Sequence, residues 1–302
     1  MKILISGTGG FLGGAFSNFC KSKGYSVLEV KREINKPADD FSNIVFYSNS
    51  LLEEDFVRQI KAFKPNIIVH FAWKGVSNEN RNEYQYRYNI NLTLESIELA
   101  KAVGSAKWIG FGSQAEYGLK KEAIDEDTPC EPISDYGKSK LSLSISSMGL
   151  CDSLEIEGAW LRIFSVFGEK DHSTALIPTV INKMLKNEDV YLSDCTQTWD
   201  YLYVNDFLEA LDAFILNFKG GIYNLGSGNA VTLKDVIELI QNKIDSKSKL
   251  HFGAIKFNKN STRFLLANIN KLSQQTNWKP RFSIEQGIEN TVVFYKKQEL
   301  IV

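Results

Sequence analysis

Tyr136 and Lys140 are spaced so that their side chains could move a proton together. If the segment is helical, residues four apart lie on one face, and the phenol comes close to the ammonium. An isolated phenol has a pKa near ~10, so it is a poor proton donor or acceptor at neutral pH. A neighbouring positive charge stabilises the phenolate and lowers that pKa toward the range where general acid–base catalysis is efficient. The pair therefore predicts proton transfer to or from an alcohol or a carbonyl.

A second tyrosine–lysine pair, Tyr117 and Lys121, has the same spacing. Gly118 follows that tyrosine directly and disfavours a helix there. Ser134, in contrast, can cap a helix that carries the first pair. That helix would have an apolar stripe at Leu141, Ile145 and Met148. We therefore expect the first pair to be the reactive one.

Ser113 could hold the oxygen atom to which such a proton is transferred. It comes just after an apolar run, Lys107–Phe111, that predicts a strand. Its hydroxyl can donate a hydrogen bond to a carbonyl oxygen. An ordinary loop serine is the alternative, and both interpretations stay open at this point.

Three glycines, Gly7, Gly10 and Gly13, lie between a predicted strand and a predicted helix. A glycine turn in that position leaves the backbone bare and aims helix amides at a bound anion, here those of Phe11, Leu12 and Gly13. The context predicts a dinucleotide site rather than a merely structural turn. An oxidised nicotinamide would add a second positive charge near the phenolate.

The end of the second predicted strand distinguishes between the two nicotinamide cofactors. An acidic residue there would accept hydrogen bonds from the ribose 2′-hydroxyl and favour NAD(H). Lys31 and Arg32 occupy the position instead, and two cations suit the 2′-phosphate of NADP(H). NAD(H) stays possible because Glu29 or Glu33 could still reach a hydroxyl.

The elements that must position these residues alternate along residues 1–165. Predicted strands are Lys2–Ser6, Ser26–Lys31, Ile44–Tyr47, Ile67–Phe71, Lys107–Phe111 and Glu155–Ile163, and predicted helices are 11–22, 53–63, 79–103 and 134–149. Strands separated by helices imply right-handed crossovers and a parallel sheet covered on both faces. The predicted fold class is α/β, a Rossmann doubly wound parallel sheet with a smaller, interleaved C-terminal substrate lobe.

The rhythm loosens after residue 165. We expect helices near 174–187, 205–217, 232–244 and 283–297, and a strand near Tyr201–Val204. The dinucleotide-binding domain is predicted to span 1–165, with 196–220 returning to it. The substrate-binding lobe would comprise 166–195 and 221–302 and form a cleft over the carboxyl ends of the strands.

Composition excludes several classes of protein. The 302 residues carry 35 Lys+Arg and 36 Asp+Glu, a net charge of -1, so no global field favours nucleic acid or an anionic membrane. With 43% hydrophobic and 24% charged residues, the chain is typical of a globular protein rather than a disordered one. The four cysteines and three histidines show no metal-ligand spacing, and we expect reduced, mostly buried cysteines. Without a signal peptide or a long apolar run, a cytoplasmic, soluble protein is expected.

Taken in order, these motifs resemble the extended short-chain dehydrogenases/reductases that act on nucleotide sugars. The resemblance covers nearly the whole chain. Beyond the glycine turn it includes the segments 70–72, 89–93, 113–118, 136–140, 161–168, 200–206 and 278–280.

The resemblance implies roles for individual residues. Tyr136 would be the proton donor or acceptor, Lys140 would also contact the nicotinamide ribose, and Ser113 would polarise the carbonyl. Other residues expected at the cofactor are Ser50, Leu51, Phe71, Ala72 and Asn89. Residues expected at the nucleotide sugar are Gln114, Ser165, Ile177, Gln197, Trp199 and Arg263.

The residues after Ser113 bear on the reaction. Family 4,6-dehydratases place Asp-Glu there, whereas this chain has Gln114-Ala115, and alanine transfers no proton; Glu116 is the remaining candidate acid. A 4-epimerase would retain NAD, and the two cations Lys31 and Arg32 disfavour that cofactor. We therefore expect an NADPH-dependent 4-ketoreductase of a nucleotide-linked 4-keto-6-deoxy sugar, in surface polysaccharide sugar biosynthesis.

Two alternative functions stay open, and further sequence features bear on the reaction and on the assembly. The alternatives are an NAD-dependent nucleotide-sugar 4-epimerase and an NADP-sensing, non-catalytic regulator, although such regulators typically lose the tyrosine or lysine. The segment 251–254 and Trp199, where many relatives have arginine, resemble deoxysugar synthases of the abequose type. By resemblance, helices 79–103 and 134–149 would pair with their copies in a homodimer, but their apolar stripes could equally be internal core.

Overall fold

The computed structural model describes residues 1–32, 44–47, 49–75, 85–257 and 262–299, without the side chains of Arg32, Phe46, Tyr86 and Tyr88. Two predictions therefore fall outside the described residues: positions 79–84 of the expected helix 79–103, and Glu33. The chain forms two compact units. The first comprises Met1–Glu116, Ser134–Arg162 and Phe218–Tyr223, and the second comprises Tyr117–Ile133, Ile163–Asn217 and Asn224–Val302.

The first unit is built on a seven-stranded sheet with the order β10-β6-β5-β4-β1-β2-β3. Its strands are β1 (Lys2–Ser6), β2 (Ser26–Arg32), β3 (Ile44–Tyr47), β4 (Ile67–His70), β5 (Lys107–Ser113), β6 (Glu157–Ile163) and β10 (Gly221–Leu225). The pairs β1–β2, β1–β4, β2–β3 and β4–β5 are all parallel. The predicted Rossmann-type parallel sheet is confirmed.

Burial explains why the central strands carry apolar runs. All four residues of β4 are buried, as expected for a strand that is covered on both faces. β1 lies between β2 and β4, and its Ile3 is opposite both Val27 and Ile67. The strand order reverses at β1 and β4, which is where open α/β sheets bind ligands beyond the carboxyl ends of their strands.

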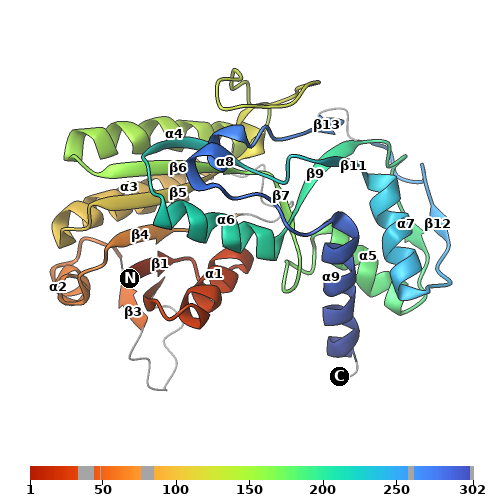
Figure 1. Ribbon diagram of the computed structural model, residues 1–302, viewed down its shortest axis with the longest axis horizontal. Coiled ribbons are helices and arrows are strands. Elements are labelled where there is room, and N and C mark those ends of the chain that lie inside the picture. The colour runs from red at the N-terminus through yellow and green to blue at the C-terminus, as the bar shows by residue number, and fades with distance from the viewer. Residues whose placement is uncertain (33–43, 48, 76–84, 258–261, 300–302) are drawn as a thin grey trace. The chain divides into compact units, whose positions relative to one another are not determined.

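The helices of the first unit correspond to the four predicted ones. They are α1 (Phe11–Ser22), α2 (Glu54–Phe63), α3 (Tyr86–Val103) and α4 (Asp135–Leu154). Among the described residues, α3 begins at Tyr86, where 79 was predicted, and α4 ends at Leu154 rather than at 149. α2, α3 and α4 lie side by side (Figure 1), and they bury sheet residues such as Leu4, Ile68 and Trp108. The Ser134 hydroxyl accepts a hydrogen bond from the Gly137 amide at 3.1 Å, so the predicted cap of α4 is confirmed.

The second unit contains short strands and five helices within its described residues. Its strands are β7 (Ser165–Phe167), β8 (Val190–Tyr191), β9 (Thr198–Tyr203), β11 (Ala230–Thr232), β12 (Leu250–His251) and β13 (Phe264–Leu265). Its helices are α5 (Leu176–Leu185), α6 (Val204–Leu216), α7 (Leu233–Ile244), α8 (Asn270–Thr276) and α9 (Ile284–Glu299). The predicted helices correspond to α5, α6, α7 and α9, whereas α8 was not predicted.

One part of the predicted domain division differs from the units. Residues 196–220 are predicted to return to the dinucleotide-binding domain. In the compact units, 196–217 group with the second unit and Phe218–Tyr223 with the first, and the division by function stays a prediction. The physical reason is strand pairing, because β9 pairs with β7, β11 and β13.

Among the described helices, none combines the length and the apolar composition needed to span a bilayer. The four cysteines form no disulfide, and Cys20, Cys151 and Cys195 are buried.

Candidate active site

The glycine turn brings β1 against the end of β4. Gly7 has φ +78°, and a Cβ atom there would lie 2.5 Å from the Ala72 amide nitrogen. A Cβ on Gly13 would overlap with the Gly7 carbonyl oxygen, whereas one on Gly9 would have nothing within 4 Å. Gly7 and Gly13 thus permit the close backbone approach, whereas a side chain at Gly9 would meet open space.

The first turn of α1 suits an anion. Gly10 is its N-cap residue and provides no side-chain hydrogen bond to the helix amides. The amides of Phe11, Leu12 and Gly13 belong to the group of N–H donors that an α-helix leaves without an intrahelical partner. Together with the bare turn, they form the kind of cradle that binds a pyrophosphate.

Glu29 on β2 is the centre of a charged network beside the turn. Its carboxylate accepts hydrogen bonds from the Thr8 hydroxyl at 2.8 Å, the Ser17 hydroxyl at 2.7 Å and the Lys21 ammonium at 2.5 Å. Lys31 Nζ lies 3.3 Å from the same carboxylate. Burial raises the pKa of Glu29, but the hydrogen bonds from Lys21, Ser17 and Thr8 outweigh it and lower the pKa to about 2. Glu29 is therefore an ionised anchor for its neighbours.

The predicted cation pair is described in part. Lys31 has an exposed fraction of 39% for its side chain, while the side chain of Arg32 lies outside the described residues. One carboxylate against the two ammonium groups of Lys21 and Lys31 leaves a net positive charge at the end of β2.

Lys140 and Tyr136 are both buried on α4, as predicted for a pair on one helix face. The ammonium donates a hydrogen bond to the Phe111 carbonyl oxygen at 2.8 Å and lies 5.9 Å from the centroid of the Tyr136 ring. Burial lowers the pKa of Lys140 to about 7, and the Glu116 carboxylate opposes part of this shift. The pair is thus held near the carboxyl end of β5, because Phe111, which accepts the hydrogen bond from Lys140, lies two residues before Ser113.

His70 at the end of β4 is a neutral neighbour of this pair. Its Nδ1 lies 2.9 Å from the Ser6 hydroxyl and its Nε2 lies 3.4 Å from the Thr93 hydroxyl. Burial and the charge of Lys140 lower the pKa of His70 to about 3. The imidazole therefore carries no charge at neutral pH.

Glu116 fixes the backbone at Ser113. The fully buried carboxylate accepts hydrogen bonds from the Ser113 amide at 2.8 Å, the Trp160 indole at 3.1 Å and the Arg162 guanidinium at 2.8 Å. A Cβ on Gly112 would overlap with the same carboxylate, which explains the glycine. The Ser113 hydroxyl accepts a hydrogen bond from the Ala115 amide at 3.2 Å and is 8% exposed as a residue.

The loop after β4 was only partly anticipated. Phe71 stacks on Phe111, with ring centroids 4.0 Å apart. Asn89 accepts a hydrogen bond from the Lys74 amide at 2.7 Å and donates one to the Lys74 carbonyl oxygen at 3.0 Å, so this predicted cofactor residue holds the loop. Sequence reasoning missed Trp73, whose ring faces Lys140; its only signal was a large aromatic residue at a strand end.

The remaining predicted cofactor residues follow β3. Leu51 is buried, and its amide donates a hydrogen bond to Glu95 at 2.8 Å. The Ser50 amide donates to Glu53 at 3.2 Å. Their expected contact with an adenine stays a prediction.

Of the six predicted substrate residues, Gln114 belongs to the first unit. The other five belong to the second unit: Ser165, Ile177, Gln197, Trp199 and Arg263. Gln197 is 6% exposed, and its Oε1 atom has no hydrogen-bond partner among the described residues. Trp199 donates a hydrogen bond to the Thr262 carbonyl oxygen at 2.9 Å. Arg263 donates to the Thr196 hydroxyl at 2.6 Å and pairs with Asp194 at 3.2 Å.

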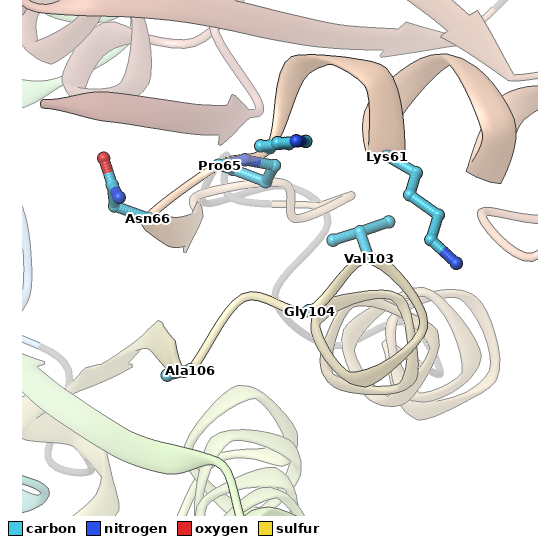
Figure 2. A pocket seen from close by; sticks show the side chains of 7 residues that line it. Lys61, Pro65, Asn66, Val103, Gly104 and Ala106 are labelled. Carbon is cyan, nitrogen blue, oxygen red and sulfur yellow. The ribbon is translucent and has the colours of Figure 1, made fainter.

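A surface cavity of about 390 Å³ lies elsewhere in the first unit (Figure 2). It is lined by Lys61, Lys64, Pro65, Asn66, Val103, Gly104 and Ala106. These residues precede β4 and β5 or end α2 and α3, so the cavity is at the amino edge of the sheet. The chemistry described above is at the carboxyl edge, and the cavity has no part in it.

Comparison with known proteins gives consistent results. The family model described as "NAD dependent epimerase/dehydratase family" matches residues 3–226. The chain is 27% identical to the CDP-abequose synthase of Salmonella muenchen, covering 95% of this chain and 96% of that protein. It is 26% identical to the UDP-glucuronate 4-epimerase of Thermodesulfobacterium geofontis, covering 99% and 97%. Over 58% of this chain and 57% of that protein, it is 27% identical to the dTDP-4-dehydro-6-deoxyglucose reductase of Escherichia coli.

A solved structure has the same fold. It is the UDP-glucose 4-epimerase of Thermotoga maritima with UDP-glucose, at a TM-score of 0.87 and 22% identity, covering 99% of this chain and 100% of that one.

Proposed function

Because the chain belongs to the NAD dependent epimerase/dehydratase family of nucleotide-sugar modifying enzymes, we propose that it is an NADPH-dependent reductase of a nucleotide-linked 4-keto-6-deoxy sugar. The observation that carries the proposal is the buried pair of Tyr136 and Lys140 beside the end of β5. A phenol next to a buried ammonium is suited to exchanging a proton with a sugar oxygen. We further propose that the product serves surface polysaccharide biosynthesis.

The glycine turn and α1 fit a dinucleotide, since their glycines leave bare backbone where a side chain would intrude. When bound, the cofactor supplies the hydride that reduces the carbonyl carbon. The Tyr136 hydroxyl donates its proton to the carbonyl oxygen, and Lys140 stabilises the phenolate that remains. Ser113 donates a hydrogen bond to the same oxygen and orients the carbonyl. Solvent then returns a proton to Tyr136.

The environment of Glu116 argues against a dehydratase. Elimination of water needs an acid and a base besides Tyr136, and Ala115 can be neither. Glu116 has both oxygens engaged, by the Ser113 amide and Trp160 on one side and by Arg162 on the other. Using this carboxylate as an acid or a base would break its fully buried ion pair with Arg162, which is strongly unfavourable.

The charge at the end of β2 supports NADP(H) over NAD(H). Glu29 already accepts hydrogen bonds from Thr8, Ser17 and Lys21, so its carboxylate is committed. Lys31 beside it contributes the positive charge that a 2′-phosphate requires. A reductase that releases its oxidised cofactor uses NADPH, whereas an epimerase that retains its cofactor uses NAD.

We assign recognition of the nucleotide sugar to Gln114 and to residues of the second unit. The buried Oε1 atom of Gln197 and the Tyr201 hydroxyl have no partner in the described part of the chain. A buried polar atom without a hydrogen bond is costly, and a ligand donor would satisfy it. We also assign to Arg263 a phosphate contact that would replace its ion pair with Asp194.

Incubation of the purified protein with NADPH and a panel of CDP-, dTDP-, GDP- and UDP-linked 4-keto-6-deoxy sugars tests the proposal. We expect NADPH consumption and a product two mass units heavier with one of them, because one hydride and one proton are added. A parallel incubation offers the corresponding 4-hydroxy nucleotide sugars with NAD. Interconversion of their 4-epimers without net cofactor consumption would replace the reductase by an NAD-dependent epimerase. Tight NADPH binding without turnover of any substrate would indicate an NADP-sensing regulator.

A homodimer formed through α3 and α4 is a second part of the proposal. Ile145 on α4 has 68% of its surface exposed, and burying this side chain against a second copy of the chain would be favourable. Sedimentation equilibrium should give a dimer mass for the native chain and a monomer mass for Ile145→Glu. A monomeric native chain at assay concentration would refute it. The expected cytoplasmic location also stays a prediction.

A further inference from the structure

Trp73 presents the face of its indole ring to Lys140. The lysine Nζ atom lies 3.4 Å from the centroid of the ring, well inside the distance of about 6 Å at which an aromatic face attracts a cation. Trp73 lies in the loop that follows β4, and Lys140 lies on α4. The contact therefore joins two distant parts of the sequence within the first unit.

The ammonium needs such a contact because it is almost completely removed from water. Lys140 is 6% exposed, and burial lowers its pKa to about 7. One N–H of the ammonium donates to the Phe111 carbonyl oxygen. The negative face of an aromatic ring favours the charged form of the amine over the neutral one. Trp73 therefore acts on a group that is close to losing its proton.

The indole is held in place by its own hydrogen bond. Trp73 Nε1 donates to Gln85 Oε1 at 2.9 Å, and Gln85 Nε2 donates to the Gly75 carbonyl oxygen at 2.7 Å. Gln85 is 3% exposed, so the bond is protected from water. The ring also meets Tyr136 edge-on, with centroids 5.9 Å apart and an interplanar angle of 83°. One fixed ring thus contacts both members of the proton-transfer pair.

We propose that Trp73, fixed by Gln85, is a positioning residue that holds the Lys140 ammonium beside Tyr136 through a cation–π contact. This inference rests on the proposed function for its catalytic meaning, because it describes how the proton donor of that reaction is prepared. The contact itself needs neither substrate nor cofactor.

Three other groups that titrate or carry charge face Lys140. His70 on β4 stays neutral, because burial and the lysine charge lower its pKa to about 3. Glu116 after β5 is ion-paired with Arg162. Tyr136 on the same helix is the third. A titration of the amine near pH 7 is therefore distinct from a change at His70.

The test is the titration of the Lys140 amine by ¹⁵N NMR on lysine-labelled, cofactor-free protein, with Lys140→Met to assign the resonance. We expect the pKa of the amine to fall in Trp73→Leu by roughly 0.5 to 1.5 pH units, the shift that a cation–π contact of ordinary strength produces. Trp73→Phe keeps an aromatic face and should give an intermediate value. A matched control is Trp108→Phe, a buried tryptophan of the same unit whose ring stacks on Trp160 at 6.3 Å.

A second readout uses the proposed reaction. The alkaline limb of the kcat/KM profile should move to lower pH in Trp73→Leu and stay in place in Trp108→Phe. An unchanged or raised amine pKa in both Trp73 variants would overturn the inference, even if NADPH is consumed. A lowered amine pKa in a protein that reduces none of the sugars would instead refute the proposed function and leave the contact between Trp73 and Lys140 established.

Discussion

Lys31 is the side chain that we propose to distinguish NADPH from NADH. Its ammonium lies 3.3 Å from Glu29, and together with Lys21 it leaves this network with a net positive charge. We expect Lys31→Glu to weaken NADPH binding by about 10- to 100-fold, since a charged hydrogen bond of about 1.5–3 kcal/mol is lost. NADH binding should change little. Isothermal titration with both cofactors measures the difference.

Lys23→Glu is the matched control for that variant. Lys23 is also an exposed lysine of the first unit, but its ammonium lies over the Phe19 ring rather than beside Glu29. The Lys23→Glu variant changes the net charge by the same amount as Lys31→Glu, and it should leave the preference for NADPH over NADH unaltered. An equal loss of NADPH and NADH affinity in Lys31→Glu would show that this lysine does not read the 2′-phosphate.

The ionised Glu29 side chain should make the free energy of unfolding depend on pH. Its folded-state pKa of about 2 lies below the ordinary value of 4.5, so its stabilising effect is complete above pH 4.5 and is lost as the pH falls toward 2. We expect Glu29→Gln to lower the free energy of unfolding at neutral pH by up to about 3 kcal/mol. The difference from the native protein should shrink between pH 4.5 and pH 2.

Urea unfolding at several pH values measures this effect, with Glu54→Gln on the exposed surface of α2 as the control. A constant difference across the whole range would mean that Glu29 contributes through packing rather than through its charge.

At the scale of elements, the glycine turn separates two kinds of glycine. Gly13 leaves no room for a side chain because a Cβ atom would overlap with the Gly7 carbonyl oxygen, while Gly9 faces open space. We expect Gly13→Ala to destabilise the protein by about 2 kcal/mol or more, as overpacking in a rigid site does. Gly9→Ala should stay within about 0.5 kcal/mol of the native protein.

Thermal unfolding of both variants checks that prediction. A tolerant Gly13→Ala, or equal losses at the two positions, would show that the turn is more adaptable than its backbone contacts imply.

Most elements were predictable where local signals agree. β1 and α1 match their predicted ranges because an apolar run, a glycine turn and an amphipathic segment follow one another. α4 begins where Ser134 indicates, but it continues to Leu154 rather than to 149. α8 and the short strands of the second unit were missed, since two- or three-residue strands depend on partners far away in the sequence.

At the scale of the whole molecule, too, features with a local sequence signal were predictable and those that depend on distant neighbours were not. Tyr136, Lys140 and the glycine turn have local spacing that points to their chemistry. The commitment of Glu29 to Lys21, the pairing of Glu116 with Arg162 and the contact between Trp73 and Lys140 depend on tertiary neighbours. The sequence offered Glu29 as a possible ribose ligand and Glu116 as a possible acid. In the folded chain both carboxylates are structural anchors.

We propose that the Tyr136 hydroxyl transfers the proton while a hydride reduces the sugar carbonyl. Tyr136→Phe removes that hydroxyl and keeps the ring. Its control is Tyr117→Phe, a buried tyrosine with the same spacing to a lysine, whose hydroxyl donates to Asn224 at 2.6 Å. That control should cost about 1 kcal/mol of stability and leave the chemistry unchanged.

The decisive measurement is the turnover of NADPH with the reducible sugar by both variants, alongside their affinities for NADPH. We expect Tyr136→Phe to lose about 100-fold or more in kcat, the usual contribution of a general acid, with NADPH affinity nearly unchanged. Tyr117→Phe should keep native turnover. A Tyr136→Phe protein that reduces the sugar at the native rate would contradict the claim.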